Sequence, residues 1–349
     1  MNAIAGATVV AAAEAALAGW RLLEAIALFD QAESLGLDAD RCAAGRWTAW
    51  MLEGQYERAW RESDAIRRRG AADPHRVWDG TPLAGRRVLI RSVHGYGDAV
   101  QMLRYAPLVR EQAARLTLQV SPRLVELARC FAGIDEVVPW GEERAFDVQL
   151  EVTELPYIFR TTLESLPAAC PYLALPRDLA LPRDPLRRSR HRPQVGLAWT
   201  GGSWNRPRSV PFELLVPLLE AFGEVDFWSL QAADDSAAWR EYWGRGCGER
   251  ELGSDSIFAL AGGIDTMDLV ITIDTLAAHL AGALGRPGWV LLRREADWRW
   301  MVDREDSPWY PSLRLFRQQV EGDWTSLMAE VARALTGWRE RWTEEERGG

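Results

Sequence analysis

The chain has 349 residues, of which 48% are hydrophobic and 26% are charged, as expected of a globular protein with two sizeable domains. Its net charge of −9 makes nonspecific nucleic-acid binding unfavourable, and because it contains no lysine, any fixed cation must come from arginine. No stretch is long enough to span a membrane, and no basic signal-peptide start is present. The cysteines are scattered, without metal-ligand spacing or a disulfide framework, which favours the cytoplasm. They are Cys42, Cys130, Cys170 and Cys247.

Residues 1–75 have an all-helical pattern. The motif W-x-L-x-x-A at 20–25 recurs loosely as G-x-Y-x-x-A at 54–59, an offset of 34 residues that resembles a tetratricopeptide repeat. The second copy is partial, since Ser63 and Ile66 replace an aromatic and a small residue. Fewer than two repeats cannot bury a continuous core. We therefore expect the helices to pack on the next domain or on a partner chain. A docked helical cap and a protein-recruiting arm both fit.

A first α/β domain is predicted at 76–180. It opens with a strand at 87–91, a glycine turn at 92–98 and a helix at 99–110, with a bend expected at Pro107. Further strands are predicted at 116–120, 136–139 and 146–150, with a helix at 122–131 and a loop at 161–173. This order predicts an open, doubly wound sheet.

The glycine turn is the first candidate site. Gly95 and Gly97 allow positive φ angles and close approach of a substrate to the backbone. Asp98 follows at the start of the helix, where its carboxylate either serves the sheet edge or only caps the helix. The turn is neither a GxGxxG fingerprint nor a P-loop, so neither dinucleotide nor ATP binding is indicated.

A linker rich in proline and arginine is predicted at 176–193, with its basic residues most simply forming a solvated face. A second α/β domain follows at 194–322, and a C-terminal helix and tail at 323–349. Its expected strands are 195–199, 225–230, 269–273, 288–292 and 313–317. Its expected helices are 211–222, 257–262 (capped by Ser254, Asp255 or Ser256), 276–284 and, in the C-terminal segment, 323–341.

The stretch DLVITIDTLAAHLAGALGRP, residues 268–287, is the second candidate site. Its apolar run is typical of a strand buried on both faces, and Thr275 is placed to cap the helix that follows. Asp274, Thr275 and His279 then gather at a helix N-terminus, which favours an anion such as phosphate. Alternatively, Thr275 is only a cap and His279 is a core histidine.

These motifs resemble those of glycosyltransferase family 9, which holds the ADP-heptose:lipopolysaccharide heptosyltransferases and tetratricopeptide-containing relatives. The turn G-x-G-D at 95–98, followed by Gln101 and Arg104-Tyr105, is similar to the family's N-terminal loop. The segment D-T-x-x-x-H-L-A-G-A-L-G-x-P at 274–287 is similar to its donor-phosphate motif, and D-S-P-W-Y-P at 306–311 resembles the repeat-containing branch. The resemblance implies an α/β GT-B architecture, in which two Rossmann-like domains face each other across the active site.

The resemblance also implies roles for individual residues. Asp98 would be the catalytic base, and Thr275 and His279 would hold the donor diphosphate beside Asp274. The remaining donor-binding candidates are Thr200, Gly201, Arg206, Arg208 and Gln231, and the acceptor-binding candidates are His94, Tyr96 and Gln101. The heptosyltransferases carry a lysine and a glutamate near the donor, whereas this chain offers only arginines there.

The predicted reaction is inverting, metal-independent sugar transfer from a nucleotide diphosphate sugar to an acceptor hydroxyl. One carboxylate on one face of the sugar implies a single displacement, and no DxD motif suggests a metal. No cofactor is expected beyond the co-substrate, for which an ADP-sugar is favoured and heptose is one candidate sugar. The acceptor would be a glycan, a protein or a small natural product. The alternatives are a nucleotide-sugar epimerase and a binding module with an inactive GT-B domain.

Overall fold

The computed structural model describes residues 2–70, 77–176, 192–201, 203–232, 235–244, 251–252 and 256–348, with backbone only at 2–5, 203–205 and 345–348. Most of the predicted linker, residues 177–191, lies outside these ranges. So do two of the candidate caps, Ser254 and Asp255. The chain divides into two compact units. The first contains 1–79, 154–167 and 295–304, and the second contains 80–153, 168–294 and 305–349.

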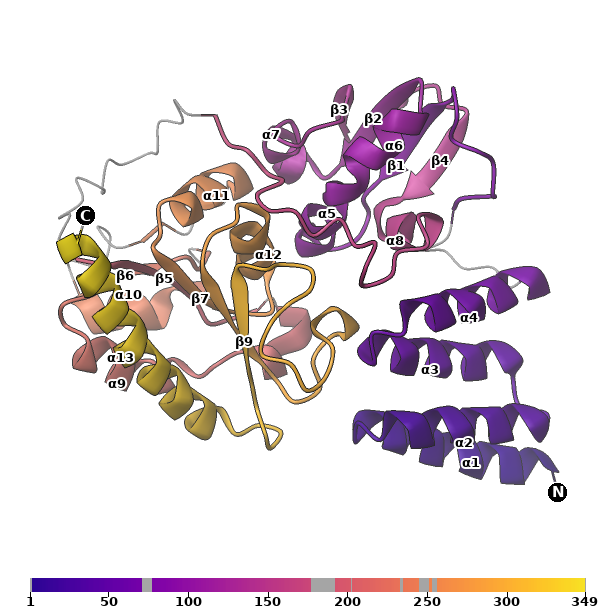
Figure 1. The fold of residues 1–349 in the computed structure, drawn as a ribbon, viewed down its shortest axis with the longest axis horizontal. Coiled ribbons are helices and arrows are strands. Elements are labelled where there is room, and N and C mark those ends of the chain that lie inside the picture. The colour runs from indigo at the N-terminus through magenta and orange to yellow at the C-terminus, as the bar shows by residue number, and fades with distance from the viewer. Residues whose placement is uncertain are drawn as a thin grey trace. The chain divides into compact units, whose positions relative to one another are not determined.

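Four helices form most of the first unit (Figure 1). They are α1 (Asn2–Ala18), α2 (Leu22–Ser34), α3 (Ala39–Leu52) and α4 (Tyr56–Arg69). The predicted repeat offset is confirmed in the positions of the helices, because Leu22 and Tyr56 each begin the second helix of a hairpin. The residues two positions earlier, Trp20 and Gly54, both have left-handed φ angles, of 59° and 72°. The two hairpins therefore turn in the same way, and glycine is the residue that adopts this backbone without strain.

Two distant stretches of chain complete the helical unit. The Trp60 indole nitrogen donates a 2.7 Å hydrogen bond to the carbonyl oxygen of Thr161. Trp298 packs edge-on against Trp47 and Tyr56, with ring centroids 5.9 and 6.2 Å apart. The helices thus pack on segments 154–167 and 295–304, which the sequence analysis placed in the two α/β domains.

The second unit contains two separate parallel sheets (Figure 1). The first has the order β3-β2-β1-β4, and its strands are β1 (Arg87–Arg91), β2 (Arg115–Val120), β3 (Glu136–Pro139) and β4 (Val148–Glu151). Its main helices are α5 (Tyr96–Met102), α6 (Ala106–Gln112) and α7 (Val125–Ala128). We call this part, residues 80–153, the front lobe.

The second sheet has the order β6-β5-β7-β8-β9. Its strands are β5 (Gln194–Ala198), β6 (Asp226–Ser229), β7 (Leu269–Ile273), β8 (Gly288–Leu292) and β9 (Leu313–Arg317). Its helices are α9 (Val216–Ala221), α10 (Ala237–Trp243), α11 (Ile257–Asp265), α12 (Leu276–Ala283) and α13 (Trp324–Gly348). We call this part, from residue 192 onward within the second unit, the rear lobe.

The predicted strands agree closely with the sheets, whereas several helices differ. The helix after the glycine turn begins at Tyr96, three residues before the predicted start, and is interrupted by a 3-10 turn at Leu103–Tyr105. Pro107 explains the interruption, since it lacks an N–H group and its ring clashes with the carbonyl four residues earlier. Two short helices were not predicted, α10 and α8 (Leu155–Ile158).

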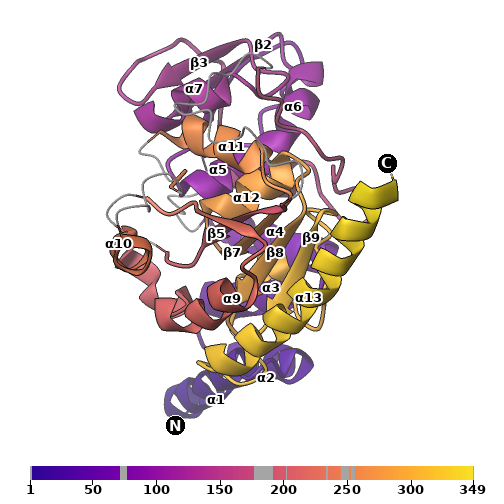
Figure 2. The same cartoon turned by 90° about the vertical axis from the view of Figure 1, so that its left-hand side faces the viewer.

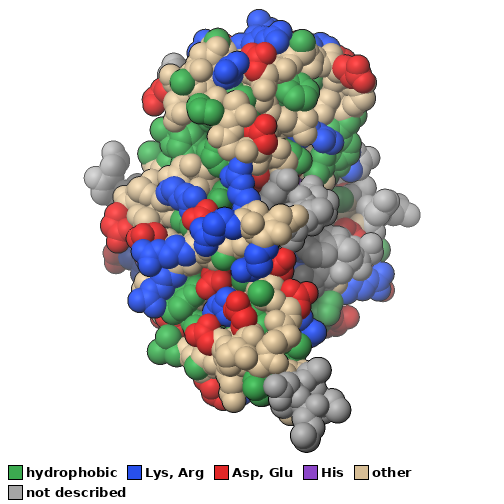
Figure 3. Space-filling view, turned by 90° about the vertical axis from the view of Figure 1, so that its right-hand side faces the viewer, with side chains coloured by type: hydrophobic (Ala, Val, Ile, Leu, Met, Phe, Trp, Pro, Cys, Tyr) green, Lys and Arg blue, Asp and Glu red, His purple; other side chains and the backbone are tan. Residues whose placement is uncertain are grey.

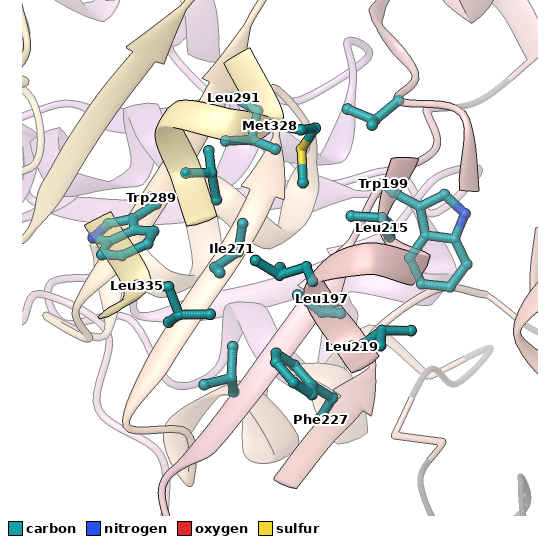
Figure 4. Close-up of a cluster of buried hydrophobic side chains, with 14 of the residues drawn as sticks. Leu197, Trp199, Leu215, Leu219, Phe227, Ile271, Trp289, Leu291, Met328 and Leu335 are labelled. Carbon is teal, nitrogen blue, oxygen red and sulfur yellow. The ribbon is translucent and has the colours of Figure 1, made fainter. Parts of the chain in front are cut away.

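The core of the rear lobe lies between its sheet and helices α9 and α13 (Figure 4). Leu197, Ile271 and Leu291 point into it from three neighbouring strands. Met328 and Leu335 cover them from α13, which lies along one face of the sheet in Figure 2. The central strands are buried along their whole length, and their mostly apolar sequences reflect this.

Among the described residues, no helix is both long and apolar enough to cross a membrane. On the face shown in Figure 3, arginine side chains lie between and beside Asp and Glu side chains. Within the helical unit, several arginines are paired with carboxylates. Arg46 contacts Asp30, Glu33 and Glu62, and Arg69 contacts Asp40.

Candidate functional site

Each sheet has a topological switch point, where neighbouring strands connect in opposite directions. In the front lobe it lies between β1 and β4, and in the rear lobe between β5 and β7. Ligands of open α/β sheets bind outside the carboxyl ends of the strands at such points. The two stretches singled out from the sequence follow β1 and β7, so both motifs lie at a switch point.

The front turn presents Asp98 in the first turn of α5. Gly95 is the N-cap residue and Asp98 is the third residue of the helix, so the alternative that Asp98 is the N-cap is wrong. A Cβ atom placed on Gly95 would lie 3.1 Å from Asp98 Oδ2, which shows that the carboxylate folds back over the turn. Asp98 is half-buried.

The predicted acceptor residues occupy different environments. His94 lies across the switch point from Glu151 at the end of β4, with Nε2 3.7 Å from Oε1. The hydroxyl of half-buried Tyr96 lies 3.5 Å from Ser121 Oγ. Gln101 is fully buried on α5, and its side-chain amide has no hydrogen-bond partner among the described residues. In this conformation Gln101 therefore offers no surface to an acceptor.

The rear turn brings Asp274, Thr275 and His279 together, as predicted. Thr275 is the N-cap residue of α12, but its side chain makes no capping bond. Its hydroxyl instead lies 3.2 Å from Thr272 Oγ1. His279 is 2% exposed; its Nδ1 lies 2.8 Å from the Tyr310 hydroxyl and its Nε2 lies 3.9 Å from Asp274 Oδ1.

The two lobes meet at this point. A Cβ atom on Gly97 would lie 2.5 Å from His279 Cδ2 and 3.1 Å from its Nε2, so only a glycine lets the imidazole approach the turn. Helices α5 and α12 lie side by side in both ribbon views (Figures 1 and 2). Asp98 directly follows Gly97, the residue that faces His279.

Gln231, at the end of β6, organises the loop that follows β5. Its Oε1 accepts hydrogen bonds from the backbone N–H groups of Trp199 and Thr200, both at 2.8 Å, and its Nε2 donates to the Thr200 hydroxyl at 3.2 Å. These bonds hold Thr200 at the rear switch point, and the Gly201 N–H donates separately to Ser209 Oγ at 3.1 Å. The structure thus shows Gln231 as a support for the loop, and its predicted contact with the nucleotide remains a prediction.

The two candidate arginines differ in position. A Cβ atom on Gly201 would lie 2.5 Å from Arg208 Nε, so this half-buried guanidinium lies directly against the loop backbone. Arg206 is exposed. Of the two, Arg208 is the one whose charge is next to the rear switch point.

Sequence reasoning missed a buried polar cluster behind His279. It consists of Arg104, Tyr172 and Tyr310, of which only Arg104 and Tyr310 lay in quoted motifs. Burial raises the pKa of the Tyr172 phenol, so this group stays protonated at neutral pH. The sequence signal for this cluster was Arg104, a charged residue among the apolar residues of the turn that follows α5. Among the described residues, no group of three or more His, Cys, Asp or Glu side chains is placed to hold a metal ion.

Two Rossmann-like parallel sheets, with switch points brought together by α5 and α12, define the second unit as a GT-B fold. Solved structures that share this fold include a family 9 glycosyltransferase from Veillonella parvula, at a TM-score of 0.51 and 12% identity, covering 76% of this chain and 99% of that one. Another is the ADP-heptose lipopolysaccharide heptosyltransferase II of E. coli, at a TM-score of 0.51 and 15% identity, covering 75% and 99%.

No family model matches the chain. A similar sequence is Protein FlbA of Caulobacter vibrioides, which is 28% identical over 292 residues. The matched region is 74% of this chain and 48% of that protein, so the chain spans about half the length of this relative.

Proposed function

We propose that the chain is a glycosyltransferase of the family 9 type, which moves a sugar from a nucleotide diphosphate sugar to an acceptor hydroxyl. The observation that carries this proposal is the contact between Gly97 and His279. It brings the residue next to Asp98 against His279 on α12, and so supports a site that combines a carboxylate of one lobe with a helix N-terminus and an imidazole of the other. Sugar transfer needs this pair: a base for the incoming alcohol, and hydrogen-bond donors for the leaving diphosphate.

The rear lobe would bind the donor. The N-terminus of α12 favours an anion, and the Thr275 side chain leaves that end of the helix uncapped. His279, Thr200 and the Gly201 backbone would add donors, and the positive charge of Arg208, with Arg206 further out, would offset the diphosphate charge. Asp274 would orient His279. We favour an ADP-sugar, in line with the motif resemblance and with the ADP-heptose named for the E. coli structure.

In the proposed mechanism Asp98 takes the proton from the acceptor hydroxyl. The hydroxyl oxygen forms a bond to the anomeric carbon from the face opposite the diphosphate, while the carbon–oxygen bond to the diphosphate breaks. The configuration is therefore inverted in one displacement. We propose that no metal ion takes part, and the corresponding test is transfer in the presence of EDTA.

Acceptor binding is assigned to the front switch point. His94 lies in the turn after β1 and Tyr96 begins α5, so both are close to Asp98 in sequence, and both are half-buried. Gln101 would contribute only if α5 moved, because it is fully buried. We place the reaction in the cytoplasm, with a glycan, a protein or a small natural product as acceptor.

A panel of ADP-, GDP-, UDP- and CMP-sugars tests donor binding by thermal shift. A donor at about 100 times its dissociation constant should stabilise the protein by roughly 3 kcal/mol. If none of the panel shifts the melting transition, the proposed function is wrong. Turnover of the donor without any acceptor would instead favour the epimerase.

The Asp98→Asn variant tests the base. With the donor identified by the panel, we expect transfer to fall about 10²- to 10⁴-fold, because a general base contributes that much, while donor affinity stays unchanged. Transfer of labelled sugar and donor affinity by calorimetry are the two measurements. Full transfer by this variant would exclude Asp98 as the base.

The helical unit supports a second, compatible proposal, that it recruits a protein partner. Its two hairpins have left-handed residues at equivalent positions, Trp20 and Gly54. Stacked helical hairpins of repeat proteins form extended binding surfaces. Removal of a partner-binding surface should lower transfer to a protein acceptor and leave donor binding unchanged. Equal transfer to a protein acceptor and to an excised fragment of it would favour a purely structural role.

A further inference from the structure

Arg104 is a buried cation that joins the two lobes. It is 4% exposed, and its Nε donates to the carbonyl oxygen of Gln101 at 2.9 Å in the front lobe. Its Nη1 donates to the carbonyl oxygen of Trp309 at 2.6 Å, in the loop before β9. Its Nη2 donates to the Tyr172 hydroxyl at 3.1 Å. A charge is costly to bury, so its retention here calls for a role beyond filling space.

The guanidinium lies against the ring of Tyr310, with its central carbon 4.7 Å from the ring centroid. Tyr310 is fully buried, and a Cβ atom on Gly282 of α12 would lie 2.2 Å from its Cδ1. A glycine on α12 therefore makes the space in which the ring lies. The ring is held between a cation and a helix, and its hydroxyl is fixed 2.8 Å from His279 Nδ1.

The direction of this last hydrogen bond decides what His279 can do. In a neutral imidazole one nitrogen carries the proton and the other accepts. A cation against the phenol ring draws electron density from it, which makes the Tyr310 hydroxyl a stronger donor. The competing acceptor is the Tyr172 oxygen, which already accepts from Arg104 and whose own proton is donated to the carbonyl oxygen of Val100. The imidazole nitrogen is the stronger acceptor of the two.

We infer that Arg104 and Tyr310 are positioning residues that hold His279 as the neutral tautomer with its proton on Nε2. Nε2 is the nitrogen that faces Gly97 and Asp274, the side on which the leaving diphosphate would bind. His279 is then a hydrogen-bond donor to a phosphate oxygen. The other tautomer would present a lone pair to it. The role of this tautomer in binding the diphosphate rests on the proposed function. The tautomer itself can be measured without any substrate.

Nitrogen-15 NMR of the full chain, labelled at histidine, measures the tautomer directly. The chain has only four histidines, and His279→Gln identifies the signal of interest. We expect a single neutral form with the proton on Nε2. A proton on Nδ1, or a doubly protonated ring at neutral pH, would overturn the inference.

Tyr310→Phe tests the cause, because it keeps the ring on Gly282 and removes only the hydroxyl. We expect the Nδ1 resonance to move towards that of a nitrogen without a hydrogen bond, and affinity for the diphosphate probe to fall about tenfold, the usual effect of one lost hydrogen bond. The probes are ADP, GDP and UDP without sugar. Tyr172→Phe is the matched control, since it removes a phenol hydroxyl from the same cluster without touching His279; it should leave both readings unchanged.

The outcomes separate the two proposals. If the unaltered chain binds none of the probes, the proposed function fails, while the NMR measurement still decides the tautomer. If the probe binds equally well to the unaltered chain and to Tyr310→Phe, the positioning role is wrong and the proposed function stands. Equal effects of the two tyrosine variants on the His279 signal would show that the cluster acts only by packing.

Discussion

At the scale of single residues, two glycines allow the lobes to come together. Gly97 leaves space for the His279 imidazole, and Gly282 leaves space for the Tyr310 ring. A β-carbon at either position would lie well inside the normal contact distance of the facing ring. The candidate site therefore depends on missing side chains as much as on those that would contact a ligand.

We expect Gly97→Ala to displace His279 and weaken donor binding. The added carbon would lie 2.5 Å from His279 Cδ2, so the imidazole or α5 must move. Overpacking of this kind costs about 1 to 3 kcal/mol of unfolding free energy. Chemical denaturation and donor calorimetry measure the two effects. Gly223→Ala is the control, because a β-carbon there meets no atom within 4 Å. Unchanged donor affinity in Gly97→Ala would contradict the proposed proximity of the turn and the donor.

His279 shows why one residue can satisfy two predictions. It is a buried histidine with a hydrogen-bonded Nδ1, as expected of a core residue. Its other edge faces the glycine turn and Asp274, as expected of a site residue. The sequence gives its place on α12 but not its partners, because Tyr310 lies 31 residues away and Gly97 lies in the other lobe.

At the scale of elements, α13 closes the core of the rear lobe. Leu335 is fully buried against the sheet, so Leu335→Ala should lower the unfolding free energy by about 2 to 5 kcal/mol. Arg333, two residues earlier on the same helix, is exposed, and Arg333→Ala should change it by less than about 0.5 kcal/mol. Urea denaturation compares the two. Equal, small effects would mean that α13 contributes little to this core.

A second prediction concerns the side-chain contacts between α4 and the segment at 154–160. Asp64 accepts hydrogen bonds from Tyr157 and Arg160. Partial burial acts to raise the pKa of the Asp64 carboxyl, but the hydrogen bonds from Arg160 and Tyr157 outweigh it, so the pKa is lowered. A lowered pKa means that the folded state prefers the ionised form. The stabilisation is therefore complete above the ordinary aspartate pKa of about 4 and is lost as the pH falls below it.

We accordingly expect Asp64→Asn to cost about 1 to 2 kcal/mol of unfolding free energy at pH 7, the range for charge-assisted hydrogen bonds at a partly exposed site. The difference in unfolding free energy between this variant and the unaltered chain should become smaller as the pH falls below about 4. Denaturation curves at several pH values measure it. A difference that stays constant down to pH 2.5 would show that the charge of Asp64 does not contribute.

At the scale of the whole molecule, the helical unit is assembled from three separate stretches of chain. Trp298, from the loop after β8, packs against Trp47 of α3 and Tyr56 of α4. The unit should therefore unfold as one body with segments 154–167 and 295–304.

Trp298→Ala tests this assembly. We expect it to cost about 2 to 4 kcal/mol and to increase amide hydrogen exchange in α3, in α4 and in both segments together, because a large aromatic contact is lost. Leu23→Ala is the control, since that side chain is 69% exposed. Faster exchange confined to residues 295–304 would show that the helices fold independently of these segments.

The strands, their order along the chain and the two turns that follow β1 and β7 could be predicted from the sequence alone. Buried parallel strands have continuous apolar runs, and glycine, proline and capping residues mark their ends, so this information is local. Five of the nine strands among the described residues have the predicted bounds: β1, β3, β7, β8 and β9.

Which side chains contact each other became clear only from the folded chain. It placed Gly97 against His279, Arg104 against Tyr310, and two distant segments on the helical unit. It also showed that Gln101 is buried and that Thr275, at the N-cap position of α12, makes no side-chain capping bond. These contacts join residues far apart in the chain, and they depend on the packing of whole elements, for which no local pattern in the sequence carries a signal.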